Sequence, residues 1–260
     1  MNVTLCYFSA TDTTRKTVRT IAQGMGATAP VELDYTMPDA RAKTPAPFTA
    51  EDFVVFGAPV YSGLLPFFCL SYLENVKGNG TPCAIAGVYG NRHYDDCLVE
   101  MEDLLTKNGF KVVAAGAFLG EHSFSADIAP GRPDATDLRA AEAFGQQVAQ
   151  KMAAGGQALA QGVIPGARPY KERAPRAATV PPTVSDACID CKMCANSCPM
   201  GAISMDDVSV IDGNKCVRCL RCVRVCPTGA INFTDEGFAK VKAYCEGAFM
   251  NPRREAEVFI

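Results

Sequence analysis

The sequence predicts an α/β domain with a doubly wound parallel sheet of five strands, followed by a small α+β domain rich in cysteine. Short apolar runs alternate with longer amphipathic segments over residues 1–154. Eight of the 13 cysteines lie between Cys188 and Cys226, in two runs of the same spacing. Strands that alternate with helices in this way are typical of a parallel sheet covered by helices on both faces.

The strands and helices of the first domain follow in order along the chain. We expect strands at residues 3–8, 31–33, 53–57, 84–89 and 112–119, because each is a short and mainly apolar run. We expect helices at residues 14–25, 66–73, 95–105 and 134–152. In the third of these helices, Leu98, Met101 and Leu105 recur at helical spacing, which predicts one buried face.

Three further segments complete the chain. Residues 155–184 contain five prolines and start with two glycines, so they form a linker that cannot be one helix. We expect this linker to lie on the first domain, and a loose tether is the alternative. Residues 185–235 form the cysteine-rich domain. Residues 236–260 are expected to form a helical extension that packs back on the body.

Composition and charge narrow the class of protein. The net charge of −3 gives no reason to expect a nucleic acid as partner, and 48% hydrophobic residues suffice for a core. No signal peptide is recognised, and no window approaches the roughly 18 apolar residues of a membrane helix, so we expect a cytoplasmic protein without a membrane span. Thirteen cysteines in that compartment indicate metal ligation rather than disulfides.

The cysteines form a duplication, in which CIDCKMCANSCP begins at Cys188 and CVRCLRCVRVCP begins at Cys216. Thiolates suit zinc or iron–sulfur clusters. Zinc sites show two C-x-x-C pairs separated by a dozen or more residues, whereas three cysteines in C-x-x-C-x-x-C and a fourth before proline are the run of bacterial ferredoxins. The spacing therefore predicts two [4Fe–4S] clusters.

In such paired runs the fourth cysteine ligates the cluster of the other run. The expected ligands are Cys188, Cys191, Cys194 and Cys226 for the first cluster and Cys216, Cys219, Cys222 and Cys198 for the second. The region 185–235 resembles a bacterial two-cluster ferredoxin with every ligand present. Apolar side chains expected to exclude water from the clusters are those of Ile189, Ile203, Val217 and Ile231.

Basic residues crowd the second run, namely Lys215, Arg218, Arg221 and Arg224. Three interpretations of these residues stay open: they raise the reduction potential of the second cluster, they dock a partner protein, or they form a solvated face. The remaining cysteines fit no ligand spacing and are expected to be small buried hydrophobes.

Hydroxyl side chains follow the first expected strand, in the loop Ser9, Ala10, Thr11, Asp12, Thr13 and Thr14. Hydroxyls and N–H groups at a helix N-terminus can cradle a phosphate, and a plain helix cap is the alternative. The glycine-rich motif of dinucleotide-binding folds is not found at this place. The loop resembles the flavodoxin phosphate loop Ser/Thr-x-Thr-Gly-x-Thr, which Ser9, Thr11 and Thr14 match, while Asp12 stands where glycine is usual.

Two later loops are expected at the same crevice, because ligands of doubly wound sheets bind outside the carboxyl ends of the strands. These loops contain Pro59, Val60, Tyr61, Ser62 and Gly63, and Tyr89, Gly90, Asn91, Arg92 and Tyr94. A tyrosine can stack on a flavin, and a glycine lets the backbone approach it closely. His93 and His122 are the two histidines, and each is either a proton donor near the flavin or a structural residue.

Residues 1–154 thus resemble flavodoxins, and the whole chain resembles the flavodoxin–ferredoxin fusion proteins of anaerobes. This resemblance implies FMN, two [4Fe–4S] clusters, and electron transfer with a redox protein or another low-potential donor or acceptor. Clusters pass single electrons and flavins accept one or two, so such a chain connects the two kinds of carrier.

Two alternatives to an electron carrier stay open. The first is a flavoenzyme that reduces a quinone, an aromatic compound or oxygen, with Glu121, His122 and Arg92 as the polar groups near the flavin. The second is a redox-sensing docking protein. A homodimer is an arrangement that the sequence neither requires nor excludes.

Overall fold

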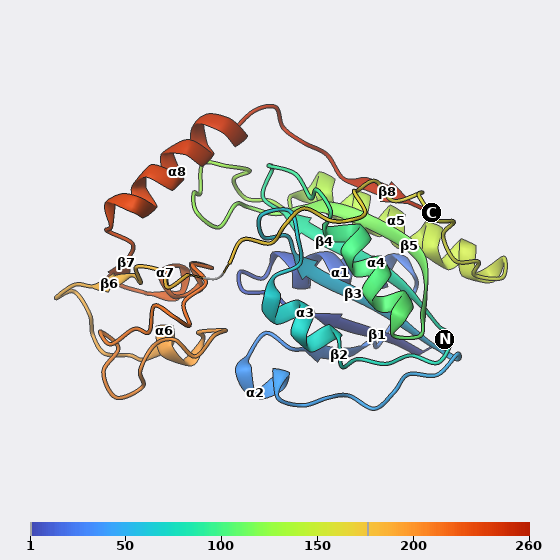
Figure 1. Cartoon of the computed structure of the whole chain (residues 1–260), viewed down its shortest axis with the longest axis horizontal. Coiled ribbons are helices and arrows are strands. Elements are labelled where there is room, and N and C mark those ends of the chain that lie inside the picture. The colour runs from blue at the N-terminus through green and yellow to red at the C-terminus, as the bar shows by residue number, and fades with distance from the viewer. Residues whose placement is uncertain (1, 176) are drawn as a thin grey trace.

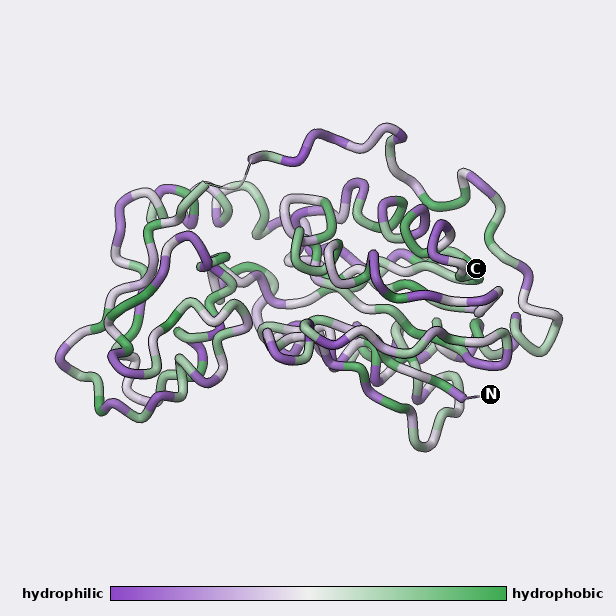
Figure 2. The backbone as a smooth tube through the Cα atoms, turned by 60° about the horizontal axis from the view of Figure 1, so that its bottom comes forward, coloured by the Kyte–Doolittle hydropathy of each residue, from purple (hydrophilic) through white to green (hydrophobic). Residues whose placement is uncertain are grey.

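The computed structural model describes residues 2–175 and 177–260, which form two lobes (Figure 1, Figure 2). Its larger elements are β1 (Asn2–Tyr7), α1 (Thr13–Gly24), β2 (Val31–Asp34), β3 (Asp52–Pro59), α3 (Phe67–Leu73), β4 (Thr81–Tyr89), α4 (Cys97–Lys107), β5 (Phe110–Leu119), α5 (Ala135–Ala153) and α8 (Glu236–Phe249). Its short elements are α2 (Pro38–Arg41), β6 (Thr183–Val184), α6 (Met193–Asn196), α7 (Arg221–Val225), β7 (Ile231–Asn232) and β8 (Glu257–Phe259).

Five parallel strands form the centre of the larger lobe in the order β2-β1-β3-β4-β5. This is the strand order of flavodoxin-like sheets, and it reverses direction between β1 and β3. The predicted fold class is therefore confirmed. The crevice expected for a ligand lies at the carboxyl ends of these strands.

The sheet has one strand more than the sequence predicted. Strand β8 pairs antiparallel with the edge strand β5, with Glu257 to Phe259 opposite Ala117 to Ala115. The expectation of five strands is corrected to six, of which five are parallel. The sequence of β8 is three residues long, too short for a period-two pattern to show.

The sheet separates two hydrophobic cores, because successive side chains of a strand point to opposite faces. On one face, Leu5 and Val55 pack against α1 and α5. On the other face, Cys6 and Phe56 pack against α3 and α4. Helices α1 and α5 approach closely at Gly145, where a Cβ atom would lie 2.1 Å from the carbonyl oxygen of Ile21.

The segment after α5 lies against α4 of the larger lobe. Ile164 is buried in the core under α4, and the amide of Ala167 donates to Asp96 over 2.8 Å. Arg168 forms ion pairs with Glu102 and Asp103 at 2.7 and 2.8 Å. The proline-rich segment is therefore held against the first domain at α4 before it enters the smaller lobe.

The smaller lobe repeats its backbone conformation in its two halves. Left-handed residues occur in pairs, namely Asp190 and Arg218, Lys192 and Leu220, and Gly201 and Gly229. The members of each pair occupy equivalent positions of the sequence duplication, and helices α6 and α7 follow the second pair. Strands β6 and β7 pair antiparallel beside a small core that contains Ile203 and Ile231.

The C-terminal extension returns from the smaller lobe to the larger one through α8 and β8 (Figure 1). The buried side chain of Asn91 donates to the carbonyl oxygens of Phe249 and Pro252 at 2.6 and 3.1 Å. The hydroxyl of Tyr94 donates to Glu257 over 2.7 Å. Within the residues that the structure describes, no helix is both long enough and apolar enough to span a membrane.

A buried ion pair between Arg132 and Asp137 connects the extension with the start of α5. Both side chains are at most 3% exposed, and Arg132 also donates to the carbonyl oxygen of Arg254 over 2.7 Å. We expect Arg132→Ala to lower the free energy of unfolding by about 3 kcal/mol, because the buried Asp137 carboxylate then keeps only the N–H of Asp134 and the more distant Arg253 as partners. Urea unfolding measures this change. The exposed Arg139 of the same helix is the control, for which Arg139→Ala costs less than about 0.5 kcal/mol; equal effects of the two substitutions would contradict the prediction.

Candidate functional site

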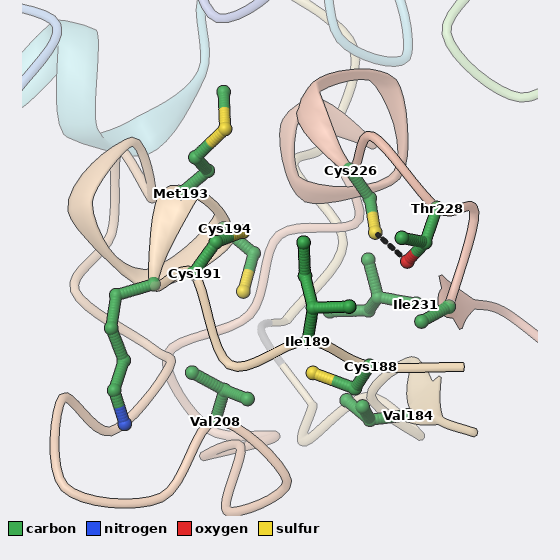
Figure 3. Close-up of a pocket in the computed structure, with 12 residues that line it drawn as sticks. Val184, Cys188, Ile189, Cys191, Met193, Cys194, Val208, Cys226, Thr228 and Ile231 are labelled. Atoms are coloured by element: carbon green, nitrogen blue, oxygen red, sulfur yellow. Dashed lines mark hydrogen bonds between the residues drawn. The ribbon is translucent and has the colours of Figure 1, made fainter. Parts of the chain in front are cut away.

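The eight cysteines of the two runs line two separate cavities. Cys188, Cys191, Cys194 and Cys226 line a cavity of about 340 Å³, the first cysteine cavity (Figure 3). Cys198, Cys216, Cys219 and Cys222 line a cavity of about 360 Å³, the second cysteine cavity. Each cavity receives three cysteines of one run and the fourth of the other, the same division as the crossed ligand sets expected from the spacing.

The surroundings of these cysteines fit thiolate ligands. Asp190 and Ala202 donate backbone N–H groups to the sulfur atoms of Cys188 and Cys198, at 3.4 and 3.3 Å. Burial opposes ionisation of Cys226, but N–H groups led by that of Ile231 lower its pKa to about 7. Burial raises the pKa of Cys219 and Cys222 to about 12, so a thiolate there needs a bound cation.

No group of three or more His, Cys, Asp or Glu side chains within residues 2–175 and 177–260 is arranged around a single metal ion. The cysteines instead surround the two cavities. Apolar side chains complete the walls, with Val184, Val208 and Ile231 at the first cavity and Val217 at the second. Ile203 and Ile231 are buried as expected, but Ile189, which lines the first cavity, is 64% exposed and does not exclude water in the way expected.

The expected crevice is a cavity of about 520 Å³ at the carboxyl ends of the strands. The loops after β1, β3, β4 and β5 line it with Ala10, Thr11, Thr13, Thr14, Pro59, Val60, Tyr61, Val88, Tyr89, Gly90, Gly120, Glu121, His122 and Ser123. Cys219 of the second run forms part of the same wall. The crevice of the larger lobe therefore adjoins the second cysteine cavity, which Cys219 also lines.

The cysteine-rich lobe matches a known family. Residues 187–230 match a family model described as 4Fe-4S dicluster domain. This part of the chain is a 4Fe-4S dicluster domain. The chain therefore joins a domain whose sheet has the flavodoxin-like strand order to a region that matches the 4Fe-4S dicluster model, which is consistent with a flavodoxin–ferredoxin fusion.

Solved structures similar to the chain include several flavodoxins. A flavodoxin from the domain Archaea is 15% identical, with 59% of this chain and 99% of that chain covered and a TM-score of 0.41. Flavodoxin 2 from Bacillus cereus is 19% identical, with 58% and 99% covered and a TM-score of 0.40. The rubredoxin oxygen:oxidoreductase from Desulfovibrio gigas is 17% identical, with 59% and 36% covered and a TM-score of 0.38. Comparison with curated protein sequences gives no match.

Some residues expected at the flavin lie outside the crevice wall of the flavodoxin-like domain. The hydroxyl of Ser9 accepts the N–H of Arg15 over 3.0 Å and thereby caps α1. Ser62 and Gly63 form a left-handed turn beside Asp95. Arg92 pairs with Asp95 at 2.8 Å, while Asn91 and Tyr94 hold the C-terminal extension.

The segment from Gly120 to Ser123 also lines the crevice. It follows β5 and includes Glu121 and His122, which the flavoenzyme alternative placed near the flavin. A Cβ atom on Gly90 would lie 2.7 Å from the Cα atom of His122, which shows how closely the loops after β4 and β5 pack.

Arg41, at the end of the unpredicted helix α2, donates to the carbonyl oxygen of Pro199 in the dicluster domain. No pattern in the sequence points to Arg41 as a domain contact.

Asp12 connects the loop from Ser9 to Thr14, the phosphate-type loop, to the dicluster domain. It takes the left-handed conformation with a φ of 64°, which an aspartate tolerates better than most residues. Its carboxylate pairs with Arg15 at 2.9 Å and with Arg221 at 3.3 Å. Arg221 also donates to the carbonyl oxygen of Ala10 over 3.1 Å. The negative charge of Asp12 is therefore compensated by two guanidinium groups.

A second arginine of α7 binds the loop after β5. Arg224 pairs with Glu121 at 2.6 Å and donates to the carbonyl oxygen of His122 over 3.3 Å. Burial and the nearby Arg224 lower the pKa of His122, and its Nδ1 atom accepts the N–H of Phe124 over 3.1 Å. His122 is therefore neutral at pH 7 with its proton on Nε2. The two arginine contacts hold α7, and with it Cys219, against the crevice.

The link between Asp12 and Arg221 can be measured by hydrogen exchange. We expect Arg221→Ala to speed the exchange of amides in residues 10–16 about fivefold, because a half-buried charge-assisted contact of about 1 kcal/mol is lost. Asp12→Asn keeps the left-handed backbone and should give a smaller increase. The double variant should exchange no faster than Arg221→Ala alone, since both changes remove one interaction.

Lys215→Ala is the matched control for this experiment. It removes the same charge from the same run, and Lys215 makes no hydrogen bond or ion pair to the flavodoxin-like domain among the described residues. Strictly additive effects of Asp12→Asn and Arg221→Ala, or an equal effect of Lys215→Ala, would show that the link does not hold the loop.

Proposed function

We propose that the chain is an electron-transfer iron–sulfur flavoprotein that passes electrons between two [4Fe–4S] clusters and FMN. The position of Cys219 carries this proposal, because this residue lines both the second cysteine cavity and the strand-end crevice. When bound, the clusters supply one-electron steps and the flavin supplies one- or two-electron steps, so the chain would connect the two kinds of carrier.

The two cavities support a crossed set of cluster ligands. Cys188, Cys191, Cys194 and Cys226 would hold one cluster, and Cys216, Cys219, Cys222 and Cys198 the other. The side chains of Val208 and Ile231 limit the access of water to the first site, and Val217 limits it at the second. Exclusion of water and N–H donors to sulfur are the means by which a protein sets cluster potentials.

The crevice supports FMN as the flavin. Thr11, Thr13 and Thr14 would bind the phosphate together with N–H groups at the start of α1. Arg15 and Arg221 compensate the charge of Asp12, which would otherwise repel the phosphate. Tyr61 and Tyr89 would flank the ring system, since each lines the crevice after a central strand.

One observation favours a flavoenzyme as a second candidate. His122 lines the crevice. Its Nδ1 atom accepts the N–H of Phe124, so its Nε2–H group is the one that could donate to a substrate. Glu121 is occupied by Arg224 and by the N–H of Gly131, and Arg92 by Asp95. A flavoenzyme would show rapid oxidation of the reduced protein by a quinone that slows in His122→Gln. An electron carrier would show slow oxidation that this substitution leaves unchanged.

Cofactor content tests the proposed function. Protein purified without oxygen should contain about eight irons and one FMN per chain, because two [4Fe–4S] clusters are expected. Cys219→Ala and Cys191→Ala should each reduce the iron to about four, through loss of the second and the first cluster respectively. Iron analysis, flavin extraction and the EPR spectrum of the reduced protein measure these changes.

Cys245→Ala is the control for the cysteine variants, since Cys245 is buried in α8 away from both cavities. It should retain the full iron content. Zinc in place of iron would refute the cluster assignment, and clusters without flavin would refute the role of the crevice.

A further inference from the structure

The charges of the dicluster domain are divided between its two halves. Residues 185–214 contain the acidic residues Asp186, Asp190, Asp206, Asp207 and Asp212 and one basic residue, Lys192. Residues 215–225 contain the basic residues Lys215, Arg218, Arg221 and Arg224 and no acidic residue. The duplicated cysteine runs thus lie in surroundings of opposite charge.

The basic half faces the flavodoxin-like domain. Arg221 and Arg224 bind the loops of the crevice, as described above. Val217 and Cys219 of the basic half pack against the core of that domain, as does Met200 of the acidic half. The second cysteine cavity therefore lies on the side of the dicluster domain that contacts the flavodoxin-like domain. An external redox protein would have to reach the first cysteine cavity instead.

The acidic half presents exposed apolar side chains around the first cysteine cavity. Ile189 and Met193 line this cavity and are 64% and 47% exposed (Figure 3). Met205 and Val210, from the loop after Ile203, are 51% and 59% exposed. Cys191 of the same cavity is exposed as well. We call Ile189 and Met193, the exposed apolar side chains that line this cavity, the apolar face.

Carboxylates form a rim beside this face. Lys192 pairs with Asp190 at 2.9 Å and donates to the carbonyl oxygen of Asp206 over 3.1 Å. Asp190, Asp207 and Asp206 all raise the pKa of Lys192, so the three carboxylates lie around one lysine. An apolar patch with a charged rim is typical of a surface that binds another protein.

We propose that the apolar face, with its rim of Asp190, Asp206 and Asp207, is the docking surface for a redox protein with a basic rim around its own centre. This inference rests on the proposed function. One electron would move in each encounter, so that the partner loses one electron and the chain gains one, or the reverse, and no bond or proton is exchanged. Charge complementarity selects a basic partner, and the exposed Cys191 places the first cluster site at the contact.

A basic redox protein, cytochrome c, serves as the probe. Carbodiimide cross-linking of the oxidised holoprotein to cytochrome c joins carboxylates to lysines, and peptide mapping then locates the joined carboxylates. We expect the cross-links at Asp190, Asp206 and Asp207. Cross-links confined to residues 1–154 would overturn the proposal.

Charge-neutralising variants provide the second measurement. In D190N/D206N/D207N, asparagine keeps the left-handed backbone at residue 190 and the turn acceptor at residue 207. We expect the Kd for cytochrome c at low ionic strength to rise about tenfold, with three rim charges contributing, and the difference to vanish at high salt. The control E51Q/E74Q/E142Q removes three exposed carboxylates from the flavodoxin-like domain and should change the Kd less than twofold.

Equal weakening by the two triple variants would overturn the proposal. Iron and flavin are determined in the same samples, so a failure of the proposed function appears as missing cofactor and not as altered binding. Should the triple variant lose iron, D206N alone and the cross-linking map of the unaltered protein still decide the question.

Discussion

The contact of helix α7 with the strand-end loops is the interaction on which the arrangement of the two domains depends. Arg221 and Arg224 lie one turn apart on this helix, and each binds a different loop of the crevice. Cys219 precedes the helix and thereby becomes part of the crevice wall. Two guanidinium groups thus position a cysteine of one domain at the candidate cofactor site of the other.

This contact is supported from both sides of the chain. The proline-rich segment is held on α4 by the ion pairs of Arg168, and the C-terminal extension is held by Asn91 and Tyr94 before β8 joins the sheet edge. Both connections between the domains are therefore anchored. Electron transfer over a short distance needs such a fixed geometry, whereas a flexible tether would make the distance variable.

The departure of the phosphate-type loop from its usual sequence has a structural reason. Glycine is usual at position 12 because the backbone is left-handed there, and Asp12 accepts this conformation. Its carboxylate adds a partner for Arg221 that glycine could not supply. The aspartate therefore serves the contact between the domains, and the arginines remove the repulsion that it would otherwise exert on a phosphate.

The sequence by itself determined the parallel sheet, the 4Fe-4S dicluster domain and the pairing of equivalent positions in its two halves, because these follow from local periodicity and cysteine spacing. Only the tertiary structure decided that Cys219 reaches the crevice, that Asn91 and Tyr94 hold the extension, and that β8 adds a sixth strand. These features join residues that lie far apart in the sequence, through a few contacts each. Spacing and periodicity carry no record of such contacts, since they describe only neighbours along the chain.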